Sequence, residues 1–260
     1  MLYWVLKYIL LGPLLRVLYR PKVTGLEYVP ADGPVIMAIN HNSFMDSIFL
    51  PLMVKRPMTF LAKDEYFITP GFKGFLMRTF FKGVGQVPID RSGGNASEAA
   101  LRTGVKVLAG GNILGIYPEG TRSPDGKLYR GHTGVARMAL AANAPVIPVA
   151  LHGTREVQPA GKTLPRVRKI SIDIGEPLDF SRYEGMDNDR FVLRSMTDEI
   201  MYEIMQLSGQ EYSDMYAGKA KKLIAERKKA AAEGGSAAKA SGESDQAAAS
   251  SDSDATSIAS

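Results

Sequence analysis

The sequence has 260 residues, of which 45% are hydrophobic and 23% are charged, and this balance excludes a disordered chain. Its length suffices for one sizeable α/β domain or two small ones. Cysteine is absent, which excludes disulfide bonds, cysteine-ligated metals and a cysteine nucleophile, and which is compatible with a reducing compartment.

Charge is distributed unevenly along the chain. The formal net charge is +5, but residues 230–260 carry a net charge of −4, so residues 1–229 carry +9. A basic folded part indicates an anionic partner, such as a phosphate, coenzyme A, an anionic lipid or a nucleic acid. A solvated basic surface explains the same charge, and charge alone favours that simpler explanation. Because no nucleic-acid recognition motif appears, we expect no nucleic-acid partner.

The first 20 residues are apolar and aromatic, but Lys7, Arg16 and Arg20 interrupt them. A membrane-spanning helix needs roughly 20 largely uncharged residues, and Pro13 is expected to break the run further. No small-residue cleavage site of a signal peptide follows. Aromatic rings suit the membrane interface and cations suit anionic head groups. We therefore expect one or two short helices lying in the membrane surface, the alternative being a helix packed on the core.

Apolar runs alternate with helical patterns through the middle of the chain. The expected strands are Pro34–Ile39, Met58–Ala62, Gln86–Ile89, Ile113–Tyr117, Val146–Leu151 and Ile170–Ile174. The expected helices cover residues 95–109, 134–143 and about 189–207. This alternation predicts an α/β fold with a mostly parallel central sheet flanked by helices.

Composition divides the chain into three segments. Residues 1–20 form the membrane-surface segment, and residues 21–229 form one folded domain that ends in a basic helix. Residues 230–260 are rich in Ala, Ser, Gly and Asp and contain no aromatic residue. Such a segment buries too little apolar surface to offset the entropy of ordering, so we expect this acidic tail to be disordered.

Several classes of chemistry lack their motif. The three histidines, His41, His132 and His152, show no metal-ligand spacing, so we expect no metal. The Gly-x-Ser-x-Gly motif of nucleophile-elbow hydrolases is absent, and no segment completes a phosphate-binding P-loop. His152, at the end of an apolar run, is expected to be structural.

The segment Ile39–Asp46 is the first informative one. It follows an expected buried strand and opens a helix, a place where ligand sites form in open α/β sheets. With His41 in the loop and Asp46 in the first helical turn, the carboxylate can reach back and orient the imidazole as a general base. The alternative is structural, because Ser43-x-x-Asp46 also matches a helix capping box.

Two further segments place charged residues after expected strands. Gly85–Arg91 ends in a cation that can hold a phosphate, although a surface arginine is the commoner explanation when it stands alone. Residues 117–123 (YPEGTRS) combine a strand-ending proline and a turn-forming glycine with Glu119 and Arg122. A turn has no need of these two charges, so we interpret Arg122 as a phosphate clamp and Glu119 as its partner or as an acceptor for a substrate hydroxyl.

Together with Val146–Val149, these segments resemble the glycerophospholipid acyltransferases, the lysophosphatidic acid acyltransferases in particular. That family carries N-H-x4-D, G-x5-R, [FY]-P-E-G-T-[RS]-S and V-P-V-like blocks in this order, and here they cover roughly residues 20–180. Ile147 departs from the last block, and the N-terminal segment is shorter than a long two-helix anchor.

The resemblance implies the roles of the site residues. His41 would be the general base and Asp46 its partner, and the phosphorylated acceptor would be held by Lys63, Arg91, Glu119, Gly120, Thr121 and Arg122. It also implies transfer of a fatty acyl group from acyl-CoA or acyl carrier protein to 1-acylglycerol-3-phosphate, which gives phosphatidic acid, with no cofactor.

The implied location is peripheral or monotopic, on the phospholipid surface at the cytoplasmic face of the cell membrane. Two alternatives remain open at this point. One is an acyltransferase for glycerol-3-phosphate or another lysophospholipid, and the other is a non-catalytic module that binds anionic lipid.

Overall fold

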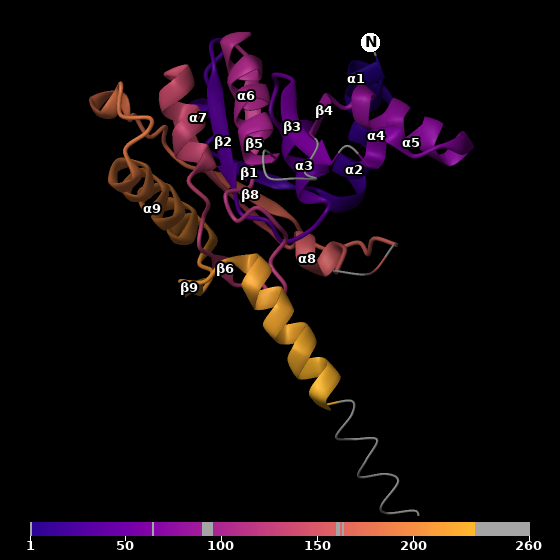
Figure 1. Ribbon diagram of the computed structural model, residues 1–260. Helices are drawn as coiled ribbons and strands as arrows, with labels where there is room; N and C mark the ends of the chain where they lie inside the picture. Colours follow the sequence, from indigo (N-terminus) through magenta and orange to yellow (C-terminus); the bar gives the residue numbers. More distant parts are fainter. Residues whose placement is uncertain (1, 64, 90–95, 160–161, 163, 232–260) are drawn as a thin grey trace, which may run out of the picture. The chain divides into compact units, whose positions relative to one another are not determined.

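The computed structural model describes residues 2–63, 65–89, 96–159, 162 and 164–231 (Figure 1). Its contacts divide the chain into two units, Met1–Ala217 and Gly218–Ser260. The first unit contains the sheet and the helices around it. In the second unit the described residues, 218–231, are helical. Most of the tail predicted for residues 230–260 lies outside the described residues, so its disorder stays a prediction.

A seven-stranded sheet forms the centre of the first unit, in the order β1-β8-β7-β2-β5-β3-β4. The five strands from β7 to β4 are parallel, whereas β8 pairs antiparallel with β7 and β1 runs parallel to β8. The predicted mostly parallel sheet is therefore confirmed. Its strands are β1 (Lys22–Thr24), β2 (Val35–Ile39), β3 (Met58–Lys63), β4 (Gln86–Ile89), β5 (Ile113–Ile116), β7 (Val146–His152) and β8 (Ser171–Ile174).

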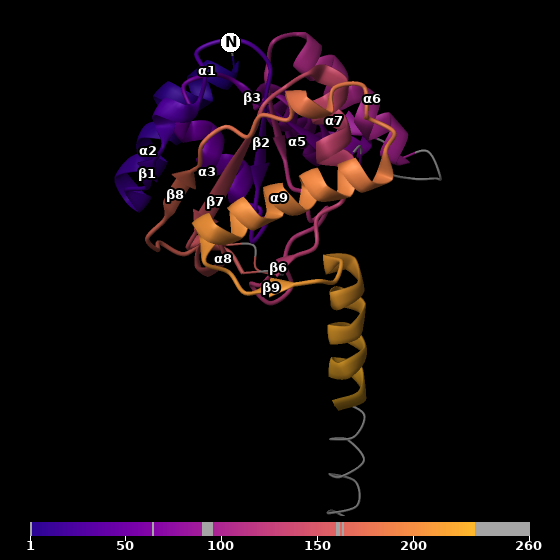
Figure 2. The ribbon, with the colours of Figure 1, turned by 90° about the vertical axis from the view of Figure 1, so that its left-hand side faces the viewer.

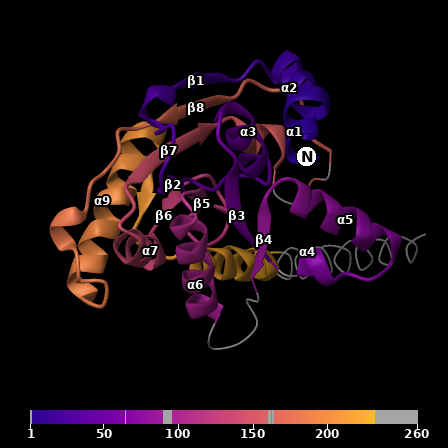
Figure 3. The ribbon, with the colours of Figure 1, turned by 90° about the horizontal axis from the view of Figure 1, so that it is seen from above.

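Helices cover both faces of the sheet, as Figures 2 and 3 show. Alternate residues of β2 enter two separate cores, since Val35, Met37 and Ile39 face α2 and α3 whereas Ile36 and Ala38 face α6, α7 and α9. Strands buried on both faces read as continuous apolar runs, which is why the pattern of β2 is uniform. The helices are α2 (Leu11–Tyr19), α3 (Asp46–Met53), α6 (Ala96–Ala109), α7 (Gly134–Ala142) and α9 (Arg190–Ser208).

The predicted strands and helices agree with the structure within one or two residues at each end. The edge strand β1 and the helices of residues 65–83 were not expected from the sequence, because short or uniformly apolar segments lack a clear period. The remaining elements are short, apart from α5. They are α1 (Leu2–Val5), η1 (Leu6–Leu10), η2 (Leu26–Tyr28), α4 (Glu65–Ile68), α5 (Gly71–Gly83), β6 (Leu128–Tyr129), α8 (Thr154–Val157), η3 (Ser181–Tyr183) and β9 (Tyr212–Ser213).

The expected break at Pro13 does not occur. Residues 2–19 are helical throughout, and a π-helical turn, η1, lies immediately before α2. A π-helical turn just before a proline re-arranges the backbone hydrogen bonds there, which is a known way for a continuous helix to accommodate the ring. By length and composition alone, Leu2–Tyr19 suffices to cross a membrane. A membrane-spanning helix is therefore an alternative to the expected location on the membrane surface. A signal sequence has a similar length and apolar composition, so this property alone does not distinguish the two.

Two cations expected to face lipid head groups point into the protein instead. The ammonium of Lys7, which is buried, donates to the carbonyl oxygens of Val54 and Lys55. The guanidinium of Arg16 donates to the carbonyl oxygen of Leu52 at 2.6 Å. Cations at a helix C-terminus satisfy its free carbonyls and complement its dipole. The N-terminal helices are therefore attached to the C-terminal end of α3.

Replacement of Gly115 by alanine should destabilise the protein by about 1–3 kcal/mol, because overpacking a filled core forces its neighbours to move. A Cβ atom on Gly115 would lie 2.5 Å from Cε1 of Phe60. Urea unfolding measures the loss. Gly134→Ala is the matched control, since a Cβ there meets no atom within 4 Å; equal stability of the two variants would contradict the prediction.

Candidate active site

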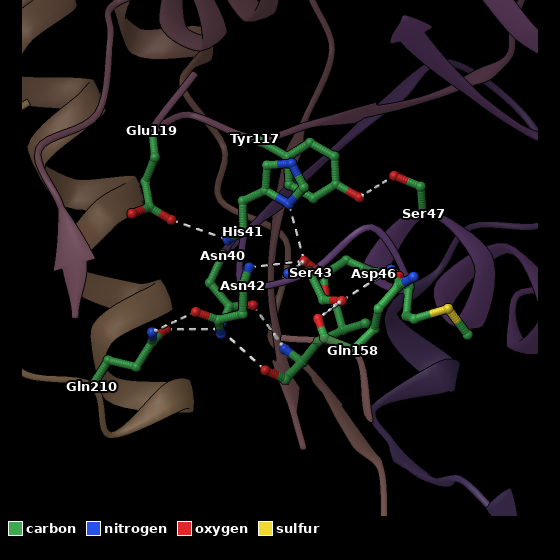
Figure 4. Close-up of polar contacts among 12 residues, drawn as sticks. Asn40, His41, Asn42, Ser43, Asp46, Ser47, Tyr117, Glu119, Gln158 and Gln210 are labelled. Atoms are coloured by element: carbon green, nitrogen blue, oxygen red, sulfur yellow. Dashed lines mark hydrogen bonds and ion pairs between the residues drawn. The ribbon is translucent and has the colours of Figure 1, made fainter. Parts of the chain in front are cut away.

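The loops after β2 and β5 meet because these strands are parallel neighbours in the sheet. The β2 loop carries Asn40 and His41, and the β5 loop carries Tyr117 and Glu119. Figure 4 shows these side chains gathered at the carboxyl ends of the strands, with Asp46 at the start of α3 beside them. The motifs that the sequence analysis singled out therefore form one site.

The central contact joins His41 to Asp46. Nδ1 of His41 lies 3.0 Å from Oδ2 of Asp46, and the carboxylate is completely buried while the imidazole is partly accessible. The predicted contact between these side chains is therefore present. A carboxylate at Nδ1 favours the tautomer with the proton on that nitrogen, which leaves Nε2 with a lone pair. This is the protonation state that a general base requires.

Asp46 also organises the loop that precedes it. The same oxygen, Oδ2, accepts hydrogen bonds from the backbone N–H groups of Asn42 and Ser43, both at 2.8 Å. The two interpretations of the sequence, a catalytic partner and a helix cap, are therefore compatible. One buried oxygen holds both the loop backbone and the imidazole.

The β5 loop fixes the backbone of His41 from the other side. The His41 N–H donates to Oε1 of Glu119 at 3.0 Å, and the His41 carbonyl accepts from the N–H of Ser123 at 2.7 Å. Oε2 of Glu119 accepts from the N–H of Tyr129 at 2.9 Å. Because Glu119 is buried and both of its oxygens accept backbone hydrogen bonds, its position suits support of the histidine loop rather than direct substrate contact.

Aromatic rings fix the plane of the imidazole. The His41 ring stacks on Tyr117 with centroids 3.7 Å apart and planes 13° apart, and Tyr117 in turn stacks on Phe60 at 5.5 Å. The Tyr117 hydroxyl lies 2.6 Å from Oγ of Ser47. Burial, followed by the charge of Asp46, raises the pKa of Tyr117 well above its usual value, so its hydroxyl stays neutral.

A second hydrogen-bond network holds the β2–α3 loop against β7 and Gln210. No role was expected for its members from the sequence. Nδ2 and Oδ1 of Asn40 bond the carbonyl and the N–H of Leu151 in the neighbouring strand. Nδ2 also donates to Oε1 of Gln210 at 2.7 Å, and Gln210 donates to Oδ1 of Asn42 at 3.2 Å. Asn40 is part of the N-H-x4-D block, so the sequence indicated that it lies near the site. Gln210 lies in no recognised motif, so the sequence did not indicate its place in this network.

A cavity of about 510 Å³ adjoins the imidazole. Its wall combines a few polar groups with many apolar side chains, which is typical of sites for small molecules with a hydrocarbon part. The polar members include His41, Thr121, Arg122 and His132. The apolar members come from seven elements and the β2–α3 loop, and include Leu6, Leu11, Phe44, Ile48, Leu52, Leu61, Phe80, Phe81, Ile116, Val135 and Met138.

The structure brings three of the predicted acceptor-binding residues to this cavity, namely Gly120, Thr121 and Arg122. Gly120 adopts a left-handed backbone, with φ at 72°, and the Arg122 side chain is exposed. Lys63 ends β3, but its side chain is not among those described. Arg91 lies outside the described residues. The predicted cluster is therefore present in part, and the roles of all these residues stay predictions.

The other two histidines differ in their positions. Nε2 of His152 lies 2.9 Å from Oδ2 of Asp173 on the neighbouring strand β8, which agrees with a structural role. His132 lines the cavity and stacks on Tyr216, and burial, followed by the charge of Arg194, lowers its pKa. Within the described ranges, no group of three or more His, Asp or Glu side chains forms a potential metal site.

Replacement of Glu119 by glutamine should lower the free energy of unfolding by about 1–3 kcal/mol, because an amide nitrogen would face a buried backbone N–H and leave it unpaired. Denaturant unfolding measures the loss. The control is Glu211→Gln at an exposed ion pair with Lys127, where we expect a change below about 0.5 kcal/mol. An unchanged stability of the Glu119 variant would contradict the proposed support of His41.

Comparisons with known proteins agree with this geometry. The acyltransferase family model matches residues 20–152. A 1-acyl-sn-glycerol-3-phosphate acyltransferase of Bacillus subtilis is 31% identical over 194 residues, which cover 73% of this chain and 88% of that protein. The chloroplastic enzyme LPAT1 of Arabidopsis thaliana is 28% identical, with 66% of this chain matching 47% of its length. The crystal structure of the lysophosphatidic acid acyltransferase PlsC from Thermotoga maritima matches with a TM-score of 0.56 and 26% identity over 74% of each chain. This chain therefore belongs to the acyltransferase family.

Proposed function

We propose that the chain transfers a fatty acyl group from a thioester to the free hydroxyl of 1-acylglycerol-3-phosphate, which yields phosphatidic acid. The observation that carries the proposal is the buried contact between His41 and Asp46 at the wall of a cavity that also holds Arg122. The names of the relatives in Bacillus subtilis and Arabidopsis thaliana support the choice of acceptor.

The reaction requires removal of one proton from the acceptor. Nε2 of His41 takes this proton while the hydroxyl oxygen attacks the thioester carbonyl carbon. A carbon–oxygen ester bond forms, the carbon–sulfur bond breaks, and the proton passes from His41 to the departing thiolate. Asp46 stabilises the imidazolium between the two transfers. No covalent acyl-enzyme and no cofactor take part, because both reacting groups belong to the substrates.

The acceptor's phosphate needs a cation near the base. Arg122 supports this role, since it lines the cavity and forms no ion pair with any residue that the structure describes, which leaves its guanidinium available for bidentate contact. Lys63 is the last residue of β3, and Arg91 follows β4, the neighbouring strand, in the sequence. Both would add positive charge at the carboxyl ends of the strands. Phosphate binding would position the hydroxyl against Nε2 of His41, and positioning can contribute as much as the base itself.

The apolar side of the cavity suits the acyl chains of the two substrates. The thioester donor is acyl-CoA or acyl carrier protein, and the thioester carbonyl is common to both. Because the acceptor and the product are membrane lipids, the enzyme would work at a phospholipid surface, at the cytoplasmic face if its donor is a soluble thioester. The exposed apolar residues of α1 to α2 support this location.

His41→Ala should reduce acyl transfer by about 10²–10⁴-fold, because it removes the base. Thiol release from acyl-CoA in the presence of lysophosphatidate measures transfer, and urea unfolding checks the fold. Asp46→Asn should reduce the rate through the wrong tautomer. The control is His152→Ala, which should keep most of the activity. Near-normal activity of His41→Ala would exclude the assignment, and lipid binding without thiol release in wild type would indicate a non-catalytic module.

Arg122→Ala should raise KM for lysophosphatidate roughly tenfold or more and leave KM for the thioester donor unchanged, since a charge-assisted contact to phosphate is lost. Initial rates over both substrate concentrations separate the two constants. Arg190→Ala, at an exposed position of α9, is the control. An effect of Arg122→Ala on the donor alone would contradict the phosphate role, and a panel with glycerol-3-phosphate and other lysophospholipids tests the alternative acceptors.

A further inference from the structure

Helix α5 has apolar side chains on both its inner and its outer face. On the inner face Phe81 is buried and contacts Phe67 of α4 and Phe44 of the β2–α3 loop, with ring centroids 6.0 and 6.4 Å apart. Phe80 and Phe81 also line the cavity. Packing against the cavity and the neighbouring rings therefore explains the apolar residues on the inner face.

The outer face has no such partner among the described residues. Ile68 at the end of α4 is 69% exposed, and on α5 Phe72 is 79%, Phe75 55% and Leu76 58% exposed. On α5, Phe75 and Leu76 lie three and four residues after Phe72, so these three fall on one side of the helix, and Ile68 lies just before it at the end of α4. A surface helix of a water-soluble protein normally carries polar residues there, whereas a helix that is apolar all round is covered by protein or by lipid.

The charge of this segment indicates which of the two covers it. Residues 68–83 contain Lys73, Arg78 and Lys82 and no acidic residue. Arg78 and Lys82 are exposed. Apolar anchors flanked by cations match an anionic phospholipid surface, because the hydrocarbon covers the rings while the cations reach the head groups.

The outer face of α5 continues an apolar surface on the N-terminal helices. The C-terminal end of α5 touches the first turn of α1, since a Cβ atom on Gly83 would lie 2.4 Å from the Leu2 side chain. Figures 1 and 3 both show α5 beside α1. The exposed apolar residues of the N-terminal helices are Leu2, Trp4, Tyr8, Ile9, Leu10, Leu14, Val17 and Leu18.

Both elements also contribute to the wall of the same cavity, α5 through Phe80 and Phe81 and the N-terminal helices through Leu6 and Leu11. An apolar cavity bounded by two elements with apolar outer surfaces suits a ligand that arrives from hydrocarbon. A second copy of this chain would cover the same surface, but it would bring the same cations against each other.

We propose that α5 inserts into the bilayer as a second anchor, with Ile68, Phe72, Phe75 and Leu76 in the hydrocarbon and Arg78 and Lys82 at anionic head groups. The proposal rests on the proposed function insofar as that function supplies a membrane lipid as substrate. It differs from the N-terminal anchor expected from the sequence, because it assigns a lipid contact to the segment between β3 and β4.

The single tryptophan, Trp4, makes a direct test possible. In the full-length chain, Trp4→Phe combined with Phe72→Trp places the only indole on α5. Trp4→Phe combined with Phe191→Trp is the matched control, since Phe191 is 90% exposed at the start of α9. Each protein is mixed with vesicles of phosphatidylcholine and phosphatidylglycerol, with and without bromine atoms on the phosphatidylcholine chains, which quench indoles that reach the hydrocarbon.

We expect a blue shift and quenching by at least about half for tryptophan at position 72, and neither for tryptophan at position 191. Quenching of wild-type Trp4 without quenching at position 72 would overturn the proposal while leaving an N-terminal anchor intact. A blue shift at position 72 that appears without vesicles and grows with protein concentration would assign the surface to a second copy, which also overturns it.

Phe72→Asn/Phe75→Asn supplies the functional test. Insertion of each phenylalanine side chain into the hydrocarbon stabilises the bound state enough for a roughly tenfold change in the partition of the protein between water and vesicles. Vesicle binding of the double variant, measured by sedimentation, should therefore fall tenfold or more. Thiol release with a lysophosphatidate of short acyl chain, below its micelle concentration, should be unchanged, because neither residue lines the cavity. If wild type itself fails in that assay, the proposed function fails and the vesicle result still decides the role of α5. Unchanged vesicle binding of the variant would overturn the proposal.

Discussion

The site depends on one carboxylate oxygen, Oδ2 of Asp46, which accepts hydrogen bonds from two backbone N–H groups and lies 3.0 Å from the His41 ring. A buried carboxylate is costly without hydrogen bonds, and among the described residues Oδ1 of Asp46 has no hydrogen-bond partner, so a relaxed loop would remove the partners of Oδ2. The same interaction thereby fixes the loop backbone, the orientation of the imidazole and the nitrogen that keeps its lone pair. A substitution of Asp46 would therefore change both the loop backbone and the orientation of the His41 ring.

The parallel pairing of β2 with β5 supplies the other half of the arrangement. It brings the segment of residues 117–123 against the histidine loop, where Glu119 and Ser123 hold the backbone of His41 while Arg122 stays exposed at the cavity. One short motif thus combines buried residues that position His41, the proposed base, with an exposed cation, Arg122, that we propose for the phosphate. This division explains why two charged residues follow each other so closely in a strand-ending turn.

Helix α3 links the candidate site to the N-terminal helices. Its first residue is Asp46, and its C-terminal carbonyls accept hydrogen bonds from Arg16 and Lys7 of the N-terminal helices. The helix that begins at the site therefore ends at the apolar surface. Since α5 lines the same cavity, the helices with apolar outer surfaces and the residues of the candidate site share packed neighbours.

The sequence by itself determined the strands and long helices, the α/β class and the contact of His41 with Asp46, because all of these depend on periodicity or on residues five positions apart. The family followed from four short blocks in order, which the comparisons confirm. Only the tertiary structure decided the strand order, and with it the backbone contacts of Glu119, the network of Gln210 with Asn40, and the apolar wall contributed by α5 and the N-terminal helices. It also overturned two expectations, the break at Pro13 and the lipid-facing position of Lys7 and Arg16. These cases have one physical reason. Hydrogen bonds and packing between distant segments depend on which elements become neighbours, and local sequence patterns do not determine that arrangement.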